Sequence, residues 1–187
     1  VALVESGGDP NAVSPSGATG YWQFLPGTGR LYGLKIDRWV DERRDLEKST
    51  HAAAGYLNHL YGIFGDWLLA CAAYNAGEGA ILRLMERHSH VDCFWDITHG
   101  MLYKDETLGF VPKILASIKI GKNREQFGLK DCEEGDALRY DVVTVNTFLS
   151  FDRIADISGQ PVAAIAALNP ELIRRCTPPS ERAYQLK

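Results

Sequence analysis

The sequence predicts a mainly α-helical protein, in which a domain of packed helices over residues 1–130 precedes a small α+β module over residues 138–187. Two observations support this fold class. Before Tyr140, apolar residues recur at helical spacing, and no alternating run of four or more residues indicates a strand. After Tyr140, the pattern changes to a β-branched run, two short helical segments and a final strand-like segment.

Two helices are expected in the middle of the first domain. Residues 45–64 place apolar side chains three or four positions apart, and Gly65 follows as a stop. Residues 67–76 form an apolar run between Asp66, a residue type that begins helices, and Gly77, a residue type that ends them. The two runs therefore predict consecutive helices joined by a tight turn.

Further helices are expected before a polar stretch. A short helix is expected around residues 81–85 and a longer one over 106–120, which Pro112 should start or kink. Residues 122–136 are polar and contain two glycines, so they are interpreted as a linker. The first residues of the chain are expected to form a helix that ends near Glu5.

The C-terminal module is expected to contain two strands and two helices. Residues 140–145 are β-branched and predict a strand, and residues 148–157 predict a helix. A second helix is expected over 161–168, because Pro161 is favoured in a first helical turn. Residues 183–187 are expected to form the closing strand.

Composition excludes several classes of function. The 187 residues are 45% hydrophobic and 24% charged, with a net charge of −4, so the basic stripe of a nucleic-acid-binding protein is absent. The longest apolar run, residues 67–74, is too short to span a bilayer. Because Glu5 lies so near the first residue, we expect the chain to be the middle of a longer polypeptide, with room for a lipid anchor in the missing N-terminal part.

No metal or cofactor is expected. The five histidines and four cysteines match no zinc-binding spacing. Cys71 lies in an apolar run and is interpreted as a small core residue. The other three cysteines, Cys93, Cys132 and Cys176, allow at most one disulfide among them, and the sequence does not indicate which two would form it.

Four sequence blocks combine an acid with aromatic rings and amides. They are Glu5-Ser6, the run Gly20-Tyr-Trp-Gln-Phe-Leu-Pro26, the run Ala72-Ala-Tyr-Asn-Ala-Gly-Glu-Gly79, and the run Glu106-Thr-x-x-Phe-Val-Pro-Lys113. A site that cleaves carbohydrate needs a proton donor, flat rings for sugar faces, and amides for hydroxyl and acetamido groups. The blocks therefore indicate a carbohydrate-cleaving site.

These blocks, in this order, resemble those of the lytic transglycosylases, over residues 1 to about 120. The resemblance implies a lysozyme-like helical catalytic domain, peptidoglycan glycan strands as the partner, and no nucleic acid. It also implies a location in the bacterial periplasm or cell envelope, in association with the outer membrane, and a monomer. The C-terminal order of strand, helix, helix and strand, with Leu168-Asn169-Pro170, resembles a degenerate LysM module. Such a module either binds glycan or packs against the first domain.

Glu5 is the candidate catalytic acid. Its apolar neighbours Ala2, Leu3 and Val4 favour partial desolvation, which would raise the pKa of the carboxyl group and keep it protonated. The resemblance implies that Glu5 protonates the oxygen between N-acetylmuramic acid and N-acetylglucosamine. It then takes the proton of the C6 hydroxyl group, which attacks the anomeric carbon, so that a 1,6-anhydromuramyl end forms without water.

The resemblance implies substrate-binding roles for six further residues. Ser6 either bonds near the acid or is satisfied by backbone, and Gln23 either contacts the sugar or bonds the main chain. Phe24 is a candidate for the glycan path, whereas Trp22 is interpreted as core. The remaining candidates are Tyr74, Asn75 and Phe110.

Phe110 departs from the family pattern, because family members usually carry Tyr at this position. Phe keeps the ring and loses a hydrogen-bond donor that would be aimed at the acid, unless Tyr103 substitutes. This departure keeps two alternatives open beside the transglycosylase. One is a hydrolytic muramidase similar to goose-type lysozyme, and the other is a non-catalytic peptidoglycan-binding protein.

Overall fold

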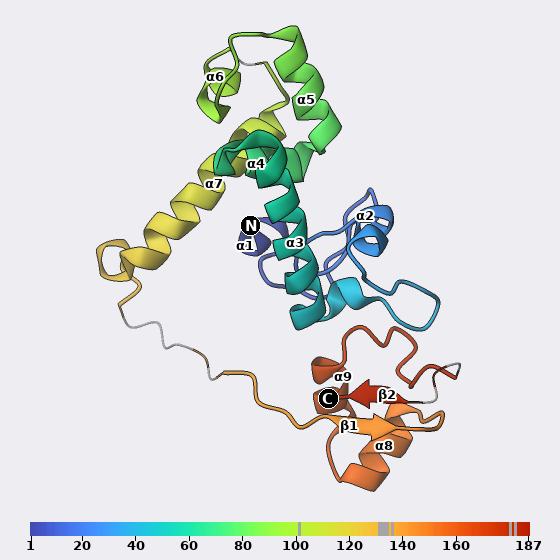
Figure 1. The fold of residues 1–187 in the computed structure, drawn as a ribbon. Coiled ribbons are helices and arrows are strands. Elements are labelled where there is room, and N and C mark those ends of the chain that lie inside the picture. Colours follow the sequence, from blue (N-terminus) through green and yellow to red (C-terminus); the bar gives the residue numbers. More distant parts are fainter. Residues whose placement is uncertain (101, 131–134, 136, 180, 182) are drawn as a thin grey trace. The chain divides into compact units, whose positions relative to one another are not determined.

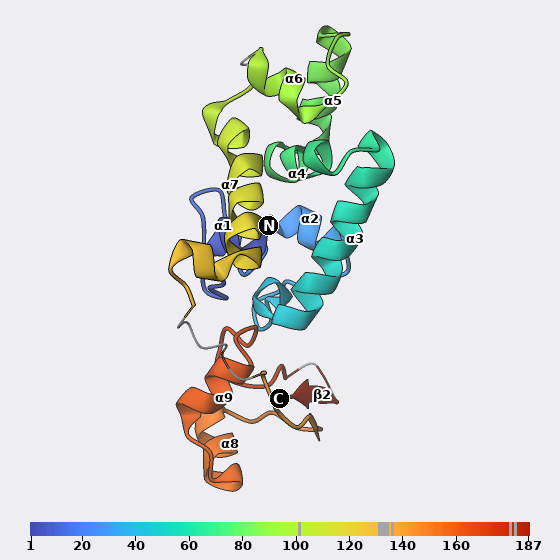
Figure 2. The ribbon, with the colours of Figure 1, turned by 90° about the vertical axis from the view of Figure 1, so that its left-hand side faces the viewer.

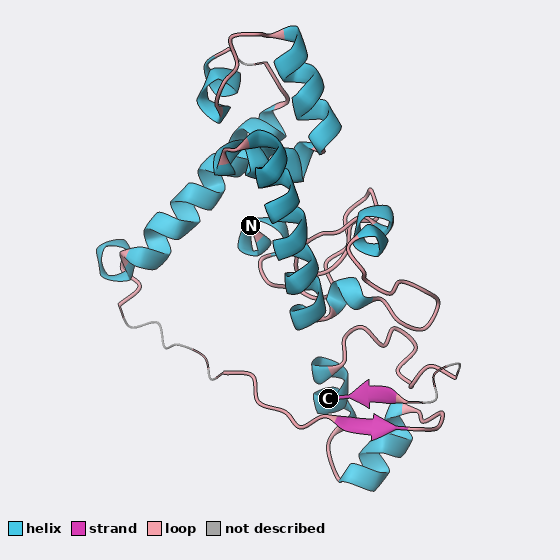
Figure 3. Cartoon of the chain, viewed as in Figure 1, coloured by secondary structure: helices cyan, strands magenta, loops and turns pink. Residues whose placement is uncertain are grey.

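The computed structural model describes residues 1–100, 102–130, 135, 137–179, 181 and 183–187 (Figure 1). Helices dominate these residues, and two short strands form one small sheet (Figure 3), so the predicted mainly α fold class is confirmed. The α-helices are α1 Ala2–Ser6, α2 Pro26–Leu31, α3 Leu46–Phe64, α4 Trp67–Ala76, α5 Glu78–Arg87, α6 Phe94–His99, α7 Asp105–Lys122, α8 Phe151–Ser158 and α9 Val162–Leu168. The 3₁₀ helices are η1 Glu42–Arg44 and η2 Arg124–Phe127, and the strands are β1 Val143–Val145 and β2 Tyr184–Leu186.

The chain divides into two compact units. The first unit contains residues 53–133 with Val1 and Leu3, and the second contains residues 4–52 and 134–187 with Ala2. These bounds differ from the domains expected from the sequence, because residues 4–52 cluster with the C-terminal module. Helix α3 begins in the second unit and ends in the first.

In the first unit, α4 is the central helix. Asp66 begins it by accepting a hydrogen bond from the N–H of Leu69 at 2.7 Å, and Gly77 follows it with φ of 85°. The expected helix over residues 67–76 is thus confirmed. Helix α4 contacts α5, α6 and α7 and lies beside α5 and α7 in both views (Figures 1 and 2).

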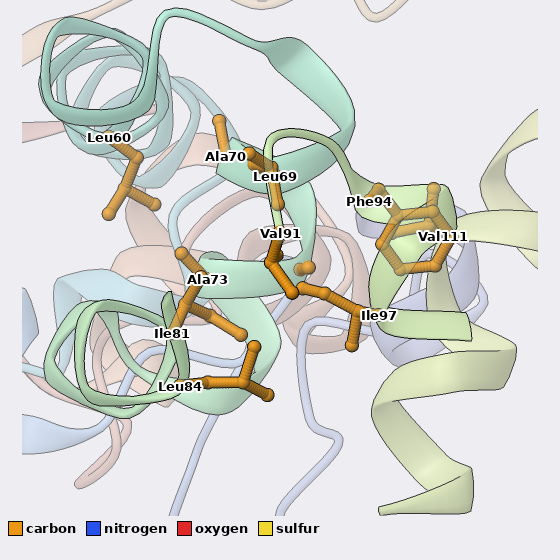
Figure 4. Packing of buried hydrophobic residues seen from close by; sticks show 11 residues of the cluster. Leu60, Leu69, Ala70, Ala73, Ile81, Leu84, Val91, Phe94, Ile97 and Val111 are labelled. Atoms are coloured by element: carbon orange, nitrogen blue, oxygen red, sulfur yellow. The ribbon is translucent and has the colours of Figure 1, made fainter. Parts of the chain in front are cut away.

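The core of the first unit forms around α4. Its buried side chains come from the end of α3, from α4 to α6 and from α7, and they face one another (Figure 4). Leu60, Leu69 and Ile81 are fully buried. Cys71 packs against this core, as expected, and burial raises the pKa of its thiol. Cys93 and Cys176 are also free thiols, whereas Cys132 lies outside the described residues.

Helix α7 contains Pro112 in its interior rather than at its start. Proline has no N–H group, so the carbonyl group of Leu108 loses its usual helical partner. The buried neighbour Val111 anchors this part of α7 in the core, which offsets that loss. The expected linker is wrong in part, because α7 runs to Lys122 and η2 follows it; residues 131–134 and 136 lie outside the described residues.

In the second unit, β1 and β2 pair antiparallel, with Val143 opposite Leu186. The chain between them forms α8 and α9, so the expected order of strand, helix, helix and strand is confirmed. Ser150 begins α8 by accepting a hydrogen bond from the N–H of Arg153, and Pro161 precedes α9.

The C-terminal elements share their core with the segment that precedes α3. Val40 is fully buried among Phe151, Ile165 and Leu186. Main-chain hydrogen bonds join the same parts, since the N–H of Asp41 donates to the carbonyl group of Glu171 at 2.9 Å. The module therefore packs against residues 35–47, which are joined to the loop that carries Gln23 through Arg43.

Candidate active site

Helix α1 presents the candidate acid on a short, anchored turn. Glu5 is partly buried. The hydroxyl group of Ser6 donates to the carbonyl group of Tyr21 at 2.8 Å and accepts from the N–H of Gly8 at 3.1 Å. Of the two expectations for Ser6, satisfaction by backbone is therefore the one observed. Its bond to residue 21 fixes the end of α1 to the segment that leads into Gln23.

Gln23 is held in a defined orientation by the main chain. Its backbone is left-handed, with φ of 50°, a conformation that few residues other than glycine adopt. Its Nε2 donates to the carbonyl groups of Gly20 at 2.9 Å and of Ala12 at 3.1 Å. A reversed amide would place Oε1 against two carbonyl oxygens, so this orientation is the favourable one.

The amide oxygen of Gln23 remains available for another partner. Both Nε2 hydrogens are used, and among the described residues no donor bonds to Oε1. Bonding to the main chain, which was the alternative to a sugar contact, is thus observed for one end of the amide. The other end offers an acceptor, which suits a hydroxyl or an acetamido N–H group.

A buried ion pair supports the loop around Gln23. Arg43 and Asp41 are 6% and 7% exposed, and their side chains meet at two points, Nε–Oδ1 at 2.8 Å and Nη2–Oδ2 at 2.7 Å. The Nη1 group of Arg43 donates to the carbonyl groups of Gly17 and Phe24, each at 2.9 Å. One guanidinium group thus holds both sides of the turn that contains Gln23.

Gly20 allows this loop to approach the chain at residue 43. A Cβ atom on Gly20 would lie 1.9 Å from the carbonyl oxygen of Arg43, and φ of Gly20 is 81°. Both the contact and the conformation require glycine.

The burial of the two aromatic residues that flank Gln23 differs from expectation. Phe24 is 2% exposed, so its ring is a core side chain and has almost no surface with which to contact a substrate. Trp22, expected in the core, is only partly buried, and its Nε1 donates to Oγ1 of Thr50 at 2.9 Å. The physical reason is the left-handed Gln23 between them, which breaks the helical spacing assumed for the two rings.

Tyr74 and Asn75 lie in the last turn of α4. The ring of Tyr74 packs against the ring of Tyr56, with centroids 5.2 Å apart. The Oδ1 atom of Asn75 accepts from the hydroxyl group of Thr107 at 2.8 Å. Since Thr107 is 4% exposed, this bond is shielded from water and leaves the two Nδ2 hydrogens of Asn75 as the groups that face other partners.

Phe110 lies one turn after Thr107 on α7 and is 6% exposed. Tyr103, the expected substitute for the missing hydroxyl group, is partly buried against the core of the first unit. Phe110 is therefore a buried apolar ring on the helix that carries Thr107.

The structure groups the candidates within each unit. Glu5, Ser6, Gln23 and Phe24 belong to the second unit, and Tyr74, Asn75 and Phe110 belong to the first. Sequence reasoning missed the supporting residues Asp41, Arg43 and Thr107, because their roles depend on burial that spacing does not reveal. Among the described residues, no group of three or more metal-ligating side chains occurs.

Comparison with known proteins decides the family. The family model described as "Transglycosylase SLT domain" matches residues 1–93, which include parts of both compact units. Membrane-bound lytic murein transglycosylase D of Escherichia coli K12 is 37% identical over 172 residues, 89% of this chain. This chain belongs to the SLT transglycosylase family.

Other members of the SLT transglycosylase family are similar over shorter stretches. Soluble lytic murein transglycosylase of Salmonella typhimurium is 33% identical over 86 residues, 43% of this chain and 13% of the relative. The crystal structure of the 70 kDa soluble lytic transglycosylase of Escherichia coli superposes with a TM-score of 0.52 at 28% identity, over 62% of this chain and 19% of that one. The chain spans only 37% of the length of transglycosylase D.

Proposed function

We propose that this chain is the catalytic part of a peptidoglycan lytic transglycosylase. It cleaves the β-1,4 bond between N-acetylmuramic acid and N-acetylglucosamine and leaves a 1,6-anhydromuramyl end. Membership of the SLT family supports this reaction. The observation that carries it is the bond from Ser6 to the carbonyl group of Tyr21, which ties the helix bearing Glu5 to the loop bearing the oriented amide of Gln23.

In the proposed mechanism, Glu5 acts first as an acid and then as a base. Its carboxyl group donates a proton to the glycosidic oxygen as the bond from C1 of N-acetylmuramic acid to that oxygen breaks. The carboxylate then takes the proton of the C6 hydroxyl group while O6 forms a bond to C1. The proton that Glu5 gave is thus replaced, and no water is consumed.

Gln23 and Asn75 offer complementary groups to amino sugars. Gln23 presents a carbonyl oxygen, and Asn75 presents N–H donors, because the main chain and Thr107 occupy the opposite ends of the two amides. An acetamido group has one donor and one acceptor, so either residue can bond to an amino sugar. We assign Gln23 and Asn75 to binding of the sugar, together with Tyr74 and Phe110.

We place this activity in the bacterial cell envelope, since relatives are named as membrane-bound and as soluble murein transglycosylases. None of the helices that the structure describes has the length and apolar character needed to cross a bilayer. A periplasmic location, a lipid anchor in a preceding segment and a monomeric state are further parts of the proposal.

In the proposed function, the role of the LysM-like module is to support neighbouring residues of the protein. Its core includes Val40, and its backbone at Glu171 holds Asp41, the partner of Arg43. These contacts favour packing against the residues beside the catalytic loop over independent binding of glycan.

Mass spectrometry of the muropeptides that the purified protein releases from sacculi tests the proposal. We expect anhydromuramyl products from the wild type and from Glu86→Gln, a control at an exposed glutamate, and none from Glu5→Gln. Products heavier by one water would indicate a hydrolytic muramidase. Binding of sacculi without any release by the wild type would indicate a non-catalytic binding protein.

A further inference from the structure

A polar cavity of about 310 Å³ lies in the second unit, beside the loop that carries Gln23. Asn11 and Arg44 line it from the N-terminal part, and Asn169 and Arg175 line it from the C-terminal module. No acidic residue lines it among the residues that the structure describes. Two guanidinium groups without a facing carboxylate indicate a site for an anion.

Arg44 has one occupied and one unoccupied edge. Its Nη1 donates to Oδ1 of Asn11 at 2.8 Å, which fixes the guanidinium plane. Its Nε atom is shielded from water and has no hydrogen-bond partner within the described part of the chain, and no bond to Nη2 occurs there either. Nε and Nη2 form the edge with which arginine binds a carboxylate at two points, and a buried donor without a partner is unfavourable.

Arg175 contributes the second positive charge from a constrained backbone. Its φ of 54° is left-handed, which is uncommon for a residue other than glycine. Two main-chain bonds hold it, from its N–H to the carbonyl group of Leu172 and from the N–H of Phe151 to its own carbonyl group, each at 2.9 Å. Its side chain is exposed, and no ion pair to it occurs in the described ranges.

The cavity adjoins the candidate sugar-binding loop through Asn11. The next residue, Ala12, accepts hydrogen bonds at its carbonyl group from Nε2 of Gln23 and from the N–H of Gly20. A ligand held at Arg44 would therefore lie against the same loop that orients Gln23. A substrate that extends sideways from the glycan strand and carries negative charge fits this arrangement.

We propose that this cavity binds a carboxylate of the peptides that peptidoglycan strands carry. Arg44 engages the carboxylate through Nε and Nη2, and Arg175 adds a second charge at the entrance. This inference rests on the proposed function, because it names the part of that substrate which the glycan-binding residues do not contact. It makes peptide-bearing strands better substrates than bare glycan.

Steady-state kinetics on matched substrates test the inference. Glycan strands with intact peptides are compared with the same strands after an amidase has removed the peptides. For Arg175→Gln and for Arg44→Lys, which keeps the charge and loses the two-point edge, we expect KM for peptide-bearing strands to rise about tenfold relative to KM for bare strands. Arg153→Gln, a control at an exposed arginine of α8, should leave this ratio as in the wild type. A ratio unchanged in both variants overturns the inference.

A binding measurement separates this inference from the proposed function. NMR titration of the wild type with a free acidic stem peptide should shift the signals of Asn11 and Arg175, and a peptide whose carboxylates are amidated should not. Weaker binding of the acidic peptide by Arg175→Gln supports the site even if no strand is cleaved. If both peptides bind alike, or neither binds, the cavity has no carboxylate site, whatever the enzyme activity.

Discussion

The carboxylate of Asp41 binds the guanidinium group of Arg43 at two points inside the protein, with atoms 2.8 and 2.7 Å apart. The pair joins two parts of the second unit. Arg43 holds the carbonyl groups of Gly17 and Phe24 on either side of Gln23, and the N–H of Asp41 donates to Glu171 in the C-terminal module. Support for the candidate sugar-binding loop therefore extends to residues far along the chain.

Removal of one partner of this pair should destabilise the protein strongly. Asp41→Ala leaves the charge of Arg43 buried without compensation, and we expect the free energy of unfolding to fall by about 3–5 kcal/mol. Urea denaturation followed by circular dichroism measures the loss. Asp156→Ala breaks an exposed pair with Arg153 at 3.9 Å and should cost less than about 1 kcal/mol. Equal losses in the two variants would mean that the buried pair does not support the fold.

Gly20→Ala should be far more harmful than an alanine at another glycine. The new Cβ would meet the carbonyl oxygen of Arg43 at 1.9 Å, on a backbone with positive φ, so the loop must move. We expect both lower stability and loss of muropeptide release. Gly62→Ala is the matched control, because it lies in α3 with open space around its Cβ and should stabilise the helix by about 0.5–1 kcal/mol. An active Gly20→Ala protein of normal stability would contradict the close approach.

Glu171 should make stability fall as pH rises. Burial raises the pKa of this carboxyl group above its ordinary value of 4.5, and its Oε2 is shielded without a partner among the described residues. The folded protein thus binds the proton more tightly than the unfolded chain does. The resulting stabilisation is complete below pH 4.5 and is lost as pH rises through the raised pKa.

Glu171→Gln should remove this pH dependence, because a neutral amide can still bond the hydroxyl group of Tyr184, which lies 2.8 Å from Oε1. Urea denaturation from pH 4 upward gives the free energy of unfolding for both proteins. We expect the free energy of unfolding of the variant to increase relative to that of the wild type as pH rises. A constant difference between them would show that Glu171 has a similar pKa in the folded and unfolded states.

The sequence predicted most of the helices because their signals are local. The apolar run between Asp66 and Gly77 became α4 with the expected ends. Helix α2 was missed because two glycines lower its helix propensity, and α6 was missed because it is short and begins with a cap in which Asp96 bonds the N–H of Cys93. Such helices depend on tertiary packing rather than on periodicity.

The candidate site was less predictable than the fold, because its geometry depends on contacts between distant residues. The motif located Gln23, but the direction of its amide follows from the carbonyl groups of Ala12 and Gly20 and from a positive φ. The same motif suggested that Phe24 faces substrate, whereas its ring is buried. Motifs thus locate site residues, and burial determines which atom of each one is available.

Phe110→Tyr should raise kcat. The ring is 6% exposed, so a new hydroxyl group must find a hydrogen-bond partner, and the sequence resemblance, in which this position usually carries Tyr, predicts that the change restores a donor that serves the acid. Initial rates on sacculi measure the effect, and the free energy of unfolding of the same variant controls for a misplaced polar group. An unchanged kcat in a stable variant would mean that another group already positions the acid.

Thr107 should act as a positioning residue for Asn75. Its buried hydroxyl group donates to Oδ1 of Asn75 at 2.8 Å, so the Nδ2 end of that amide is the end left for other partners. Thr107→Val keeps the shape and removes the donor, so the amide can reverse and present oxygen where sugar binding needs N–H. One lost hydrogen bond of about 1 kcal/mol corresponds to a KM about fivefold higher, with kcat changed less. Thr107→Ser restores the hydroxyl group and should recover KM. If Val and Ser variants gave the same KM, the role of Thr107 would be packing alone.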